Sequence, residues 1–257
     1  MKLSPCVEIL FPGMDMEARL REVKKAGFDV FEFWGWWDKD IDRLITVKDE
    51  LGLSVSTFCA RNSSLVDSSR HGEFLQGLKE SIDVAKALNC DRLIAQTGQA
   101  MPGMSREEQR RNLVEGLRKC LPLLETEGIT LLLEPLNTLV DHKGYYLERS
   151  DEAFGIIEEL RSPLVKVLFD IYHQQITEGN LIPNITAHID KIGHFHVADH
   201  PGRHEPGTGE INYGNVLKAI AASGYSGYIG LEYKPLGDVI RSFRDVKALV
   251  EGAQELK

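Results

Sequence analysis

Residues 105–134 read SREEQRRNLVEGLRKCLPLLETEGITLLLE, and this stretch holds the helix of one predicted β/α unit and the strand of the next. Ser105 followed by Glu108 is a capping box, a pattern that satisfies free backbone N–H groups at the start of a helix. Apolar residues then recur with helical spacing, and Gly128 is typical of a helix end. The apolar run after it, which ends at Glu134, predicts a buried strand. The stretch therefore predicts a helix that leads directly into a strand.

The same alternation of a short β-rich run and a longer helical segment fills the rest of the chain, giving eight units. Strands that alternate with helices pair in parallel through right-handed crossovers. Eight units in about 250 residues match a (β/α)8 TIM barrel, whereas a doubly wound open sheet would need fewer strands or a second domain. We therefore predict an α/β fold with a single TIM-barrel domain over residues 1–257. The predicted strands cover residues 7–11, 30–34, 54–59, 92–96, 130–134, 165–170, 192–197 and 228–232, and the predicted helices cover 16–26, 38–51, 74–88, 105–127, 151–160, 181–189, 213–223 and 239–252.

The composition is that of an ordinary globular protein, with 42% hydrophobic and 27% charged residues. It excludes the collagen-like, disordered and disulfide-scaffold classes. Acidic residues outnumber basic ones by 39 to 30, and a net charge of -9 repels phosphate backbones, so we expect no nucleic-acid partner. The four cysteines form no C-x-x-C pair, which disfavours a cysteine zinc site. The N-terminal residues do not resemble a signal peptide and no apolar run could span a bilayer, so we expect a reduced, cytoplasmic protein with no membrane partner.

Four of the predicted strands place a metal-type ligand at or near their carboxyl end. In a TIM barrel these ends form the active face. A lone carboxylate there would carry a large desolvation cost, which convergence around a cation removes. Hard oxygen donors with one imidazole favour Mg²⁺ or Mn²⁺, with Co²⁺ or Zn²⁺ as alternatives. The candidate ligands are Glu134, Asp170, His196 and Glu232, although each taken alone could be an ordinary polar residue at a strand end.

A second histidine accompanies the candidate ligand on the strand predicted over residues 192–197. His194 and His196 are two residues apart, so both side chains point to the same face of the strand. His196 lies nearer the carboxyl end and is the better ligand. His194 is either a hydrogen-bonded histidine of the barrel core or a group that supports a ligand from behind.

The segment 200–210 is rich in glycine, proline and charge, which predicts a loop over the active face. Arg203 is the only cation of fixed charge in this loop. A guanidinium suits the carboxylate of a substrate because it can form two parallel hydrogen bonds with it. The alternative is a structural ion pair with Glu205 or Glu210.

Two other regions are weaker candidates for the site. Glu32 ends a predicted strand close to Trp34, Trp36 and Trp37, and it either lines the pocket or lies at the surface or behind a ligand. The tryptophans either wall a small-molecule site or form a subunit contact. Residues 141–146 follow the strand that ends at Glu134, which indicates a substrate or lid loop.

Five motifs carry a resemblance to a known family. They are LEPLN at 133–137, FDIYH at 169–173, HFHVAD at 194–199, PGRHEPGTGEINY at 201–213 and GLEY at 230–233. Together they resemble the hydroxypyruvate isomerase family, a group of xylose isomerase-like TIM barrels whose relatives include ketose 3-epimerases and endonuclease IV. The resemblance covers essentially the whole chain. The motif at 201–213 is its specific part, since the four ligand positions are shared across the wider superfamily.

The resemblance implies roles for particular residues. Ketose epimerases carry a glutamate six residues beyond the first metal glutamate, and Val140 stands at that position here, which argues against a close epimerase. The family pattern implies that Glu134 and Glu232 bind the metal and form the acid–base pair, that Asp170 and His196 complete the metal site, and that His173 and Arg203 hold the substrate.

The activity that the resemblance implies is that of a sugar-acid aldose–ketose isomerase of carbohydrate metabolism. Hydroxypyruvate would become tartronate semialdehyde by metal-assisted proton transfer through an enediolate. The alternatives are a 2-oxo-tetronate isomerase or a ketose 3-epimerase and, more remotely, an endonuclease IV-like DNA-repair nuclease or a non-catalytic sugar-binding barrel. The expected partner is a small hydroxy-keto acid or sugar, and a homo-oligomer is a further expectation because relatives of this fold commonly associate.

Overall fold

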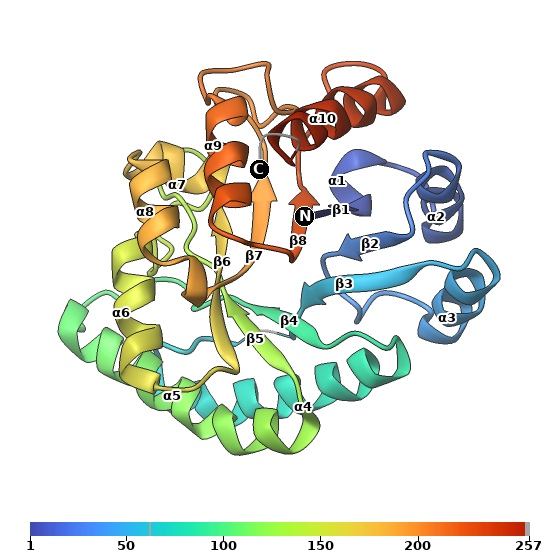
Figure 1. Cartoon of the computed structure of the whole chain (residues 1–257). Coiled ribbons are helices and arrows are strands. Elements are labelled where there is room, and N and C mark those ends of the chain that lie inside the picture. The colour runs from blue at the N-terminus through green and yellow to red at the C-terminus, as the bar shows by residue number, and fades with distance from the viewer. Residues whose placement is uncertain (62, 255–257) are drawn as a thin grey trace.

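The computed structural model describes residues 1–61 and 63–254. Eight parallel strands form one sheet in the order β1-β8-β7-β6-β5-β4-β3-β2. A parallel bridge between Cys6 and Glu32 joins the two edges, so the sheet is a nearly closed barrel with helices around it (Figure 1). This confirms the predicted α/β TIM barrel. The strands are β1 (Lys2–Pro5), β2 (Val30–Phe33), β3 (Ser54–Cys59), β4 (Arg92–Ala95), β5 (Thr130–Leu133), β6 (Val165–Asp170), β7 (Ile192–Val197) and β8 (Tyr228–Leu231).

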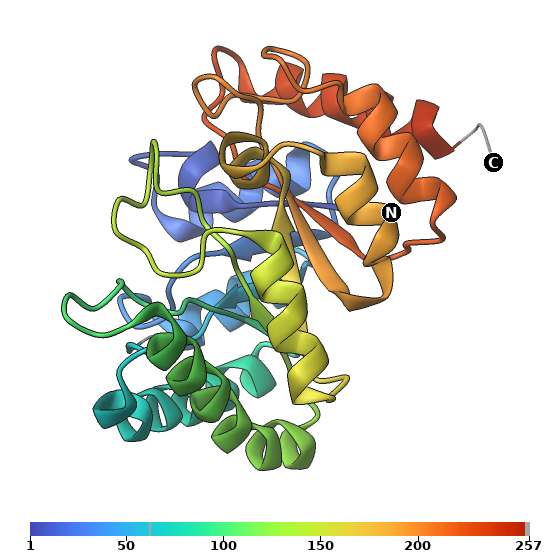
Figure 2. The ribbon, with the colours of Figure 1, turned by 90° about the vertical axis from the view of Figure 1, so that its left-hand side faces the viewer.

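Long loops gather at one end of the barrel. In Figure 2 the green loop after β4 and the yellow-green loop after β5 project on one side of the molecule, while both chain ends lie toward the other. The carboxyl ends of the strands open onto the loop-rich side, which is the active face of this architecture. The helices are α1 (Val7–Leu10), α2 (Met16–Lys25), α3 (Ile41–Glu50), α4 (His71–Ala87), α5 (Arg106–Glu127), α6 (Ser150–Leu160), α7 (Ile171–Thr177), α8 (Leu181–Ala187), α9 (Tyr213–Ala222) and α10 (Val239–Gln254), with 3₁₀ turns at Ser68–Arg70 and Ile189–Lys191.

The strand predicted over residues 7–11 is wrong. Most of these residues form the short helix α1, and the first strand precedes it at Lys2–Pro5. Val7, Ile9 and Leu10 are buried in the helix as they would be in a strand. A run of four or five apolar residues satisfies either structure, because periodicity cannot separate them over so short a length.

The other predicted strands, and the predicted helices, agree with the structure to within a few residues. The unit that contains α5 follows its sequence signals closely. The Ser105 hydroxyl accepts a hydrogen bond from the Glu108 backbone N–H at 3.1 Å, and Gly128 ends the helix with a left-handed φ of 68°. Among the residues that the structure describes, no helix has the length and apolar character needed to cross a membrane.

Two apolar clusters hold the barrel together. The larger one lies between the sheet and the surrounding helices. The smaller one consists of Ile94, Leu132 and Leu168, with Cys59 packed against it. Because successive residues of a strand point to opposite faces, these side chains point into the barrel. They form an apolar floor beneath the carboxyl ends of β4, β5 and β6.

The Phe58→Ala variant is expected to lower the free energy of unfolding by about 3–5 kcal/mol. Phe58 is fully buried and stacks on Phe33 with ring centroids 4.8 Å apart, so truncation leaves a cavity in the larger cluster. Urea denaturation measures the loss. The control is Val140→Ala, whose side chain is exposed and whose effect should stay within about 0.5 kcal/mol. Equal losses in the two variants would contradict this account of the core.

Candidate active site and metal centre

The structure brings together all four side chains that the sequence marks as candidate ligands. Glu134, Asp170, His196 and Glu232 are buried, and each offers a ligand atom within 4.8 Å of those of the others. Strand register produces this meeting, because Asp170 at the end of β6 pairs with His196 on β7, and His196 pairs with Gly230 on β8. Glu134 and Glu232 come directly after β5 and β8. The parallel sheet therefore places four sequence-distant groups at one rim.

The geometry of this group fits a divalent cation. His196 Nδ1 lies 3.5 Å from Glu134 Oε1, 3.5 Å from Glu232 Oε2 and 3.9 Å from Asp170 Oδ2. Ligand atoms that each lie about 2.0–2.2 Å from one ion are about 3–4 Å from one another. His196 Nδ1 is buried and has no hydrogen-bond partner among the described residues. An imidazole nitrogen left without a partner among three carboxylates is what a metal site requires.

The carboxylates of the group differ in their electrostatic surroundings. Burial raises the pKa of Glu134 and of Asp170 above their ordinary values, and neighbouring carboxylates add to that effect. Burial also disfavours ionisation of Glu232, but Arg203 and His196 outweigh it and hold the pKa of Glu232 well below its usual range. The site thus contains two buried glutamates, Glu134 and Glu232, whose pKa values are displaced in opposite directions.

Glu32 lies inside the barrel next to this group, not at the surface. Its Oε2 is 3.0 Å from His194 Nε2, and its Oε1 is 2.9 Å from His196 Nε2. Burial alone would raise the pKa of Glu32, but His196 and His194 outweigh it and lower the pKa to about 2. His194 is fully buried and hydrogen-bonded to Glu32. Both residues therefore lie behind the candidate ligand His196 rather than at the surface.

Both oxygens of Glu232 are bound by groups from distant parts of the chain. The Trp34 indole N–H donates a hydrogen bond to Oε1 at 2.6 Å, and Arg203 Nη2 donates to Oε2 at 2.5 Å. The alternative pairing of Arg203 with Glu205 or Glu210 is therefore wrong for this structure. Glu205 instead accepts from the Leu236 backbone N–H, and Glu210 accepts from the side chain of Gln175.

His173 presents one ring nitrogen to the same site. It lies on α7, a seven-residue helix absent from our sequence prediction, whose start is capped by Asp170 accepting from the His173 backbone N–H at 3.0 Å. The Asn137 side-chain amide donates to His173 Nδ1 at 2.6 Å, so the ring hydrogen is on Nε2. Nε2 lies 3.7 Å from Asp170 Oδ2, is buried and has no hydrogen-bond partner among the described residues. Burial, together with the charge of Arg203, lowers the pKa of His173 well below its ordinary value, so the ring is a neutral donor.

A cavity of about 360 Å³ is lined by three of the four candidate ligands, Glu134, His196 and Glu232. Trp34 and Trp37 line it, and they are 43% and 49% exposed. The loop 141–146 also contributes: His142 lines the cavity. In the same loop Tyr145 donates its hydroxyl hydrogen to the Glu134 carbonyl at 3.1 Å. The remaining lining residues are Cys59, Ile94, Gln96, Leu136 and Arg203.

The loop that carries Arg203 is organised by Asp199, a residue that sequence reasoning did not single out. Its buried carboxylate accepts hydrogen bonds from the backbone N–H groups of His200, Gly207 and Ile211 at 2.9, 2.8 and 3.1 Å. The loop also contains a cis His200–Pro201 peptide bond. In the sequence, the dense content of glycine, proline and charge indicated a loop. The role of the Asp199 carboxylate as the hydrogen-bond acceptor of this loop is visible only in the structure.

The Asp199→Ala variant is expected to speed amide hydrogen exchange in residues 204–212. The variant removes three hydrogen bonds to a charged acceptor, each of which contributes about 1.5–3 kcal/mol. Mn²⁺ affinity should stay close to the parent value, because the candidate ligands lie on the strands. Hydrogen exchange read by mass spectrometry tests the loop, with the exposed Glu210→Gln change in the same loop as control. Unchanged protection in Asp199→Ala would contradict the role given to the carboxylate.

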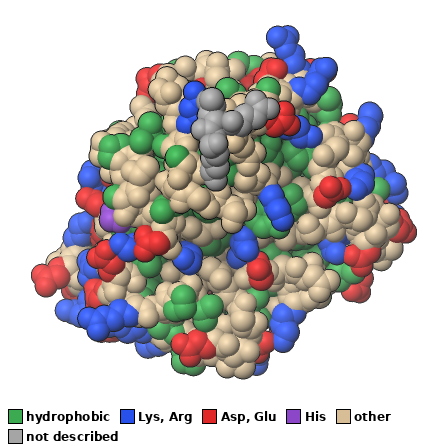
Figure 3. All heavy atoms as spheres, viewed as in Figure 1, with side chains coloured by type: hydrophobic (Ala, Val, Ile, Leu, Met, Phe, Trp, Pro, Cys, Tyr) green, Lys and Arg blue, Asp and Glu red, His purple; other side chains and the backbone are tan. Residues whose placement is uncertain are grey.

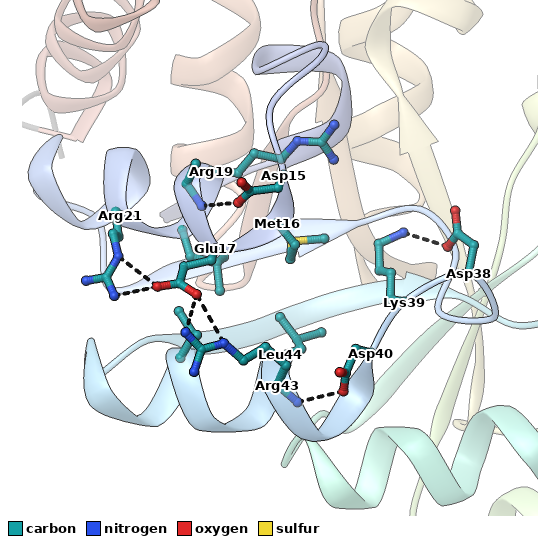
Figure 4. A pocket seen from close by; sticks show the side chains of 13 residues that line it. Asp15, Met16, Glu17, Arg19, Arg21, Asp38, Lys39, Asp40, Arg43 and Leu44 are labelled. Atoms are coloured by element: carbon teal, nitrogen blue, oxygen red, sulfur yellow. Dashed lines mark hydrogen bonds and ion pairs between the residues drawn. The ribbon is translucent and has the colours of Figure 1, made fainter.

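A larger hollow of about 660 Å³ lies between α2 and α3, away from the candidate ligands (Figure 4). Several of its charged groups already have partners within the protein: Glu17 pairs with Arg21 at 2.6 Å and also with Arg43, and Asp40 accepts from the Arg43 backbone N–H. Because these charges already have protein partners, the hollow does not point to a ligand.

Known proteins with similar sequences and folds belong to the same class of barrel. A family model described as xylose isomerase-like TIM barrel matches residues 20–253. The chain is 35% identical over 243 residues to a hydroxypyruvate isomerase from Escherichia coli (strain K12), covering 91% of this chain and 94% of that protein. It is 28% identical over 247 residues to a 2-oxo-tetronate isomerase from Haemophilus influenzae, covering 93% and 95%. A crystal structure titled AP endonuclease, family 2, from Brucella melitensis superposes with a TM-score of 0.90 at 29% identity, covering 96% and 98%. The chain therefore belongs to the hydroxypyruvate isomerase family of xylose isomerase-like TIM barrels.

Proposed function

We propose that the protein is a metal-assisted sugar-acid isomerase that interconverts hydroxypyruvate and tartronate semialdehyde. The observation that carries the proposal is the meeting of Glu134 and Glu232 in one buried ligand group, with Arg203 beside it. The two carboxylates supply an acid–base pair, and the guanidinium supplies a partner for the carboxylate of the substrate. The named relatives are isomerases, and family membership makes this chain an isomerase too.

The reaction moves hydrogens within one molecule. A proton leaves carbon 3 of hydroxypyruvate and a proton enters carbon 2, while another passes from the oxygen on carbon 3 to the oxygen on carbon 2. One of Glu134 and Glu232 removes the carbon-bound proton, and the other returns a proton or handles the hydroxyl hydrogen. His173 donates its Nε2–H to a substrate oxygen. Arg203 holds the carboxylate, and it leaves or shares its contact with Glu232 to do so.

A divalent metal ion fits the four candidate ligands. When bound, it supplies a positive charge that stabilises the negative oxygen developing on the substrate. Mg²⁺ or Mn²⁺ suits a set of three carboxylates and one imidazole best, and Co²⁺ or Zn²⁺ can use the same set. A cytoplasmic location and association with copies of the same chain stay predictions.

A substrate panel with product identification by NMR tests the proposal. We expect turnover of hydroxypyruvate to tartronate semialdehyde, its loss after dialysis against EDTA, and its return on addition of Mn²⁺ or Mg²⁺. The panel also contains 2-oxo-tetronates and free ketoses. Absence of isomerised product from every member of the panel, with Mn²⁺ present, would overturn the proposed function.

A 2-oxo-tetronate isomerase is the second candidate. The cavity of about 360 Å³ falls in the lower part of the range of ligand pockets, about 300–1,000 Å³, and has room for an acid longer than three carbons. Preferred turnover of a 2-oxo-tetronate in the panel would favour it. A ketose 3-epimerase has less support, because Val140 is 59% exposed and supplies no polar group at the position where epimerases carry a glutamate.

A DNA-repair nuclease has the least support. The view in Figure 3 shows acidic and basic side chains interspersed over the face of the molecule opposite the loop-rich active face, so it is the net charge that speaks against a nuclease. The net charge of -9 opposes binding to a phosphate backbone. Cleavage of a duplex that contains an abasic site, measured beside the isomerase panel, would favour the nuclease.

A further inference from the structure

Glu32 is the centre of a buried polar cluster, the Glu32 cluster, made of Glu32, His194, His196, Ser56 and Ser4. Glu32 Oε2 lies 3.0 Å from His194 Nε2 and accepts a hydrogen bond from the Ser56 hydroxyl at 3.2 Å. Its Oε1 lies 2.9 Å from His196 Nε2 in an ion-pair contact, and neither atom forms an aligned hydrogen bond with a described residue. The hydroxyls of Ser4 and Ser56 are 2.6 Å apart. All five residues are at most 3% exposed, so the carboxylate depends on these neighbours for the partners that water would otherwise supply.

The two ring nitrogens of His196 face different groups. Nε2 faces Glu32, and Nδ1 faces Glu134, Asp170 and Glu232. A metal ion needs the lone pair of the nitrogen that it binds, and an ionised carboxylate offers lone pairs but no hydrogen. The hydrogen of a neutral ring therefore belongs on Nε2, toward Glu32. Carboxylates commonly fix the tautomer of a metal-binding histidine in this way.

The backbone beside the cluster leaves room for this contact. Gly230 pairs with His196 across β7 and β8. A Cβ atom at position 230 would lie 2.2 Å from Glu32 Oε1 and 2.4 Å from His196 Cδ2. Any larger residue at this position would push the carboxylate and the imidazole apart. The close approach of Glu32 to His196 thus depends on a residue without a side chain on the neighbouring strand.

We propose that Glu32 is a positioning residue that keeps the ring hydrogen of His196 on Nε2 and so presents Nδ1 to the metal ion. His194 donates to the other carboxylate oxygen and holds Glu32 in this orientation. The inference rests on the metal site of the proposed function. It assigns Glu32 no contact with the substrate.

The first test needs no variant. In the full-length protein with ¹⁵N-labelled histidine, loaded with Zn²⁺, long-range ¹H–¹⁵N NMR shows which nitrogen of His196 carries hydrogen. The expected result is hydrogen on Nε2 and a metal-shifted Nδ1. Hydrogen on Nδ1, or a ring that does not respond to Zn²⁺, would overturn the proposal.

The second test compares Mn²⁺ affinity by calorimetry. Glu32→Gln replaces the carboxylate with a neutral amide, one end of which donates hydrogen, so it can no longer present an acceptor oxygen to each of the two histidines. We expect it to weaken Mn²⁺ binding about 10- to 100-fold. Ser4→Ala is the matched control, because it removes a hydroxyl from the same buried cluster that touches Ser56 and not Glu32, and it should leave the affinity near the parent value.

The outcomes separate this inference from the proposed function. If the parent protein binds Mn²⁺ and Glu32→Gln binds it equally well, the inference fails while the proposed function stands. If the parent binds two ions, with Glu32 and His194 as ligands of the second, the positioning role is also wrong. If the parent binds no divalent ion, the inference and the metal assistance of the proposed function fail together.

Discussion

The Glu232→Gln variant is expected to lower kcat for hydroxypyruvate by at least about 100-fold and by up to about 10⁴-fold, and Glu134→Gln is expected to act similarly. Each substitution removes one carboxylate of the proposed acid–base pair with little change in shape. The rate of tartronate semialdehyde formation, followed by NMR at saturating Mn²⁺, measures the loss. Incorporation of solvent deuterium at carbon should fall in parallel, because the same carboxylates exchange the carbon-bound hydrogen.

Glu210→Gln is the matched control, since Glu210 is an exposed glutamate on the active face whose carboxylate binds the Gln175 side chain. Mn²⁺ content should be measured in each variant, so that loss of the ion is distinguished from loss of proton transfer. Turnover near the parent value in both Glu134→Gln and Glu232→Gln would show that the proposed acid–base pair is wrong.

The Arg203→Met variant is expected to raise KM for hydroxypyruvate by about two to three orders of magnitude. Removing one partner of a buried, hydrogen-bonded charge pair costs about 2–5 kcal/mol, and about 1.4 kcal/mol corresponds to a tenfold change. The Arg203 side chain is 13% exposed, pairs with Glu232 and lines the cavity, so a substrate carboxylate bound to it would be largely shielded from water. Steady-state kinetics measures the effect.

A neutral substrate analogue separates recognition of the carboxylate from damage to Glu232. Dihydroxyacetone has a hydroxymethyl group where hydroxypyruvate has its carboxylate. If Arg203 binds the carboxylate, Arg203→Met should lose far more activity on hydroxypyruvate than on dihydroxyacetone. Arg241→Met controls for the lost charge, because the Arg241 side chain is 79% exposed. Equal losses on both substrates would mean that Arg203 acts only through Glu232.

The fold was predictable because its signals are local. The cap at Ser105, the glycine at the end of α5 and the apolar runs of β5, β6 and β7 each lie within a short stretch of sequence. The first strand was missed because its apolar neighbours at residues 7–11 satisfy a helical turn as well as a strand. Helix α7 was missed because seven residues give less than two clear periods, and only the Asp170 cap marks its start.

The four candidate ligands were predictable because parallel strands bring their carboxyl ends to one rim. The side chains that surround these ligands were harder to predict from the sequence. The indole of Trp34 reaches Glu232 across 198 residues of sequence, and Glu32 reaches His194 across 162. No local pattern specifies such contacts, since they depend on barrel closure. From the sequence alone, we could not decide whether Glu32 and His194 lie at the surface, in the barrel core or in the site.

The way Asp199 holds the loop after β7 has a consequence for how this enzyme could acquire new substrates. The candidate metal ligands lie on strands of the barrel or directly after them, while Arg203 lies on a loop that the Asp199 carboxylate and a few backbone hydrogen bonds hold in shape. If Arg203 binds the substrate acid as proposed, mutations in that loop can replace it with another group while the candidate metal ligands are left unchanged. Laboratory evolution that randomises residues 201–209 and preserves Asp199 is therefore a direct way to change the substrate preference from acids to neutral sugars.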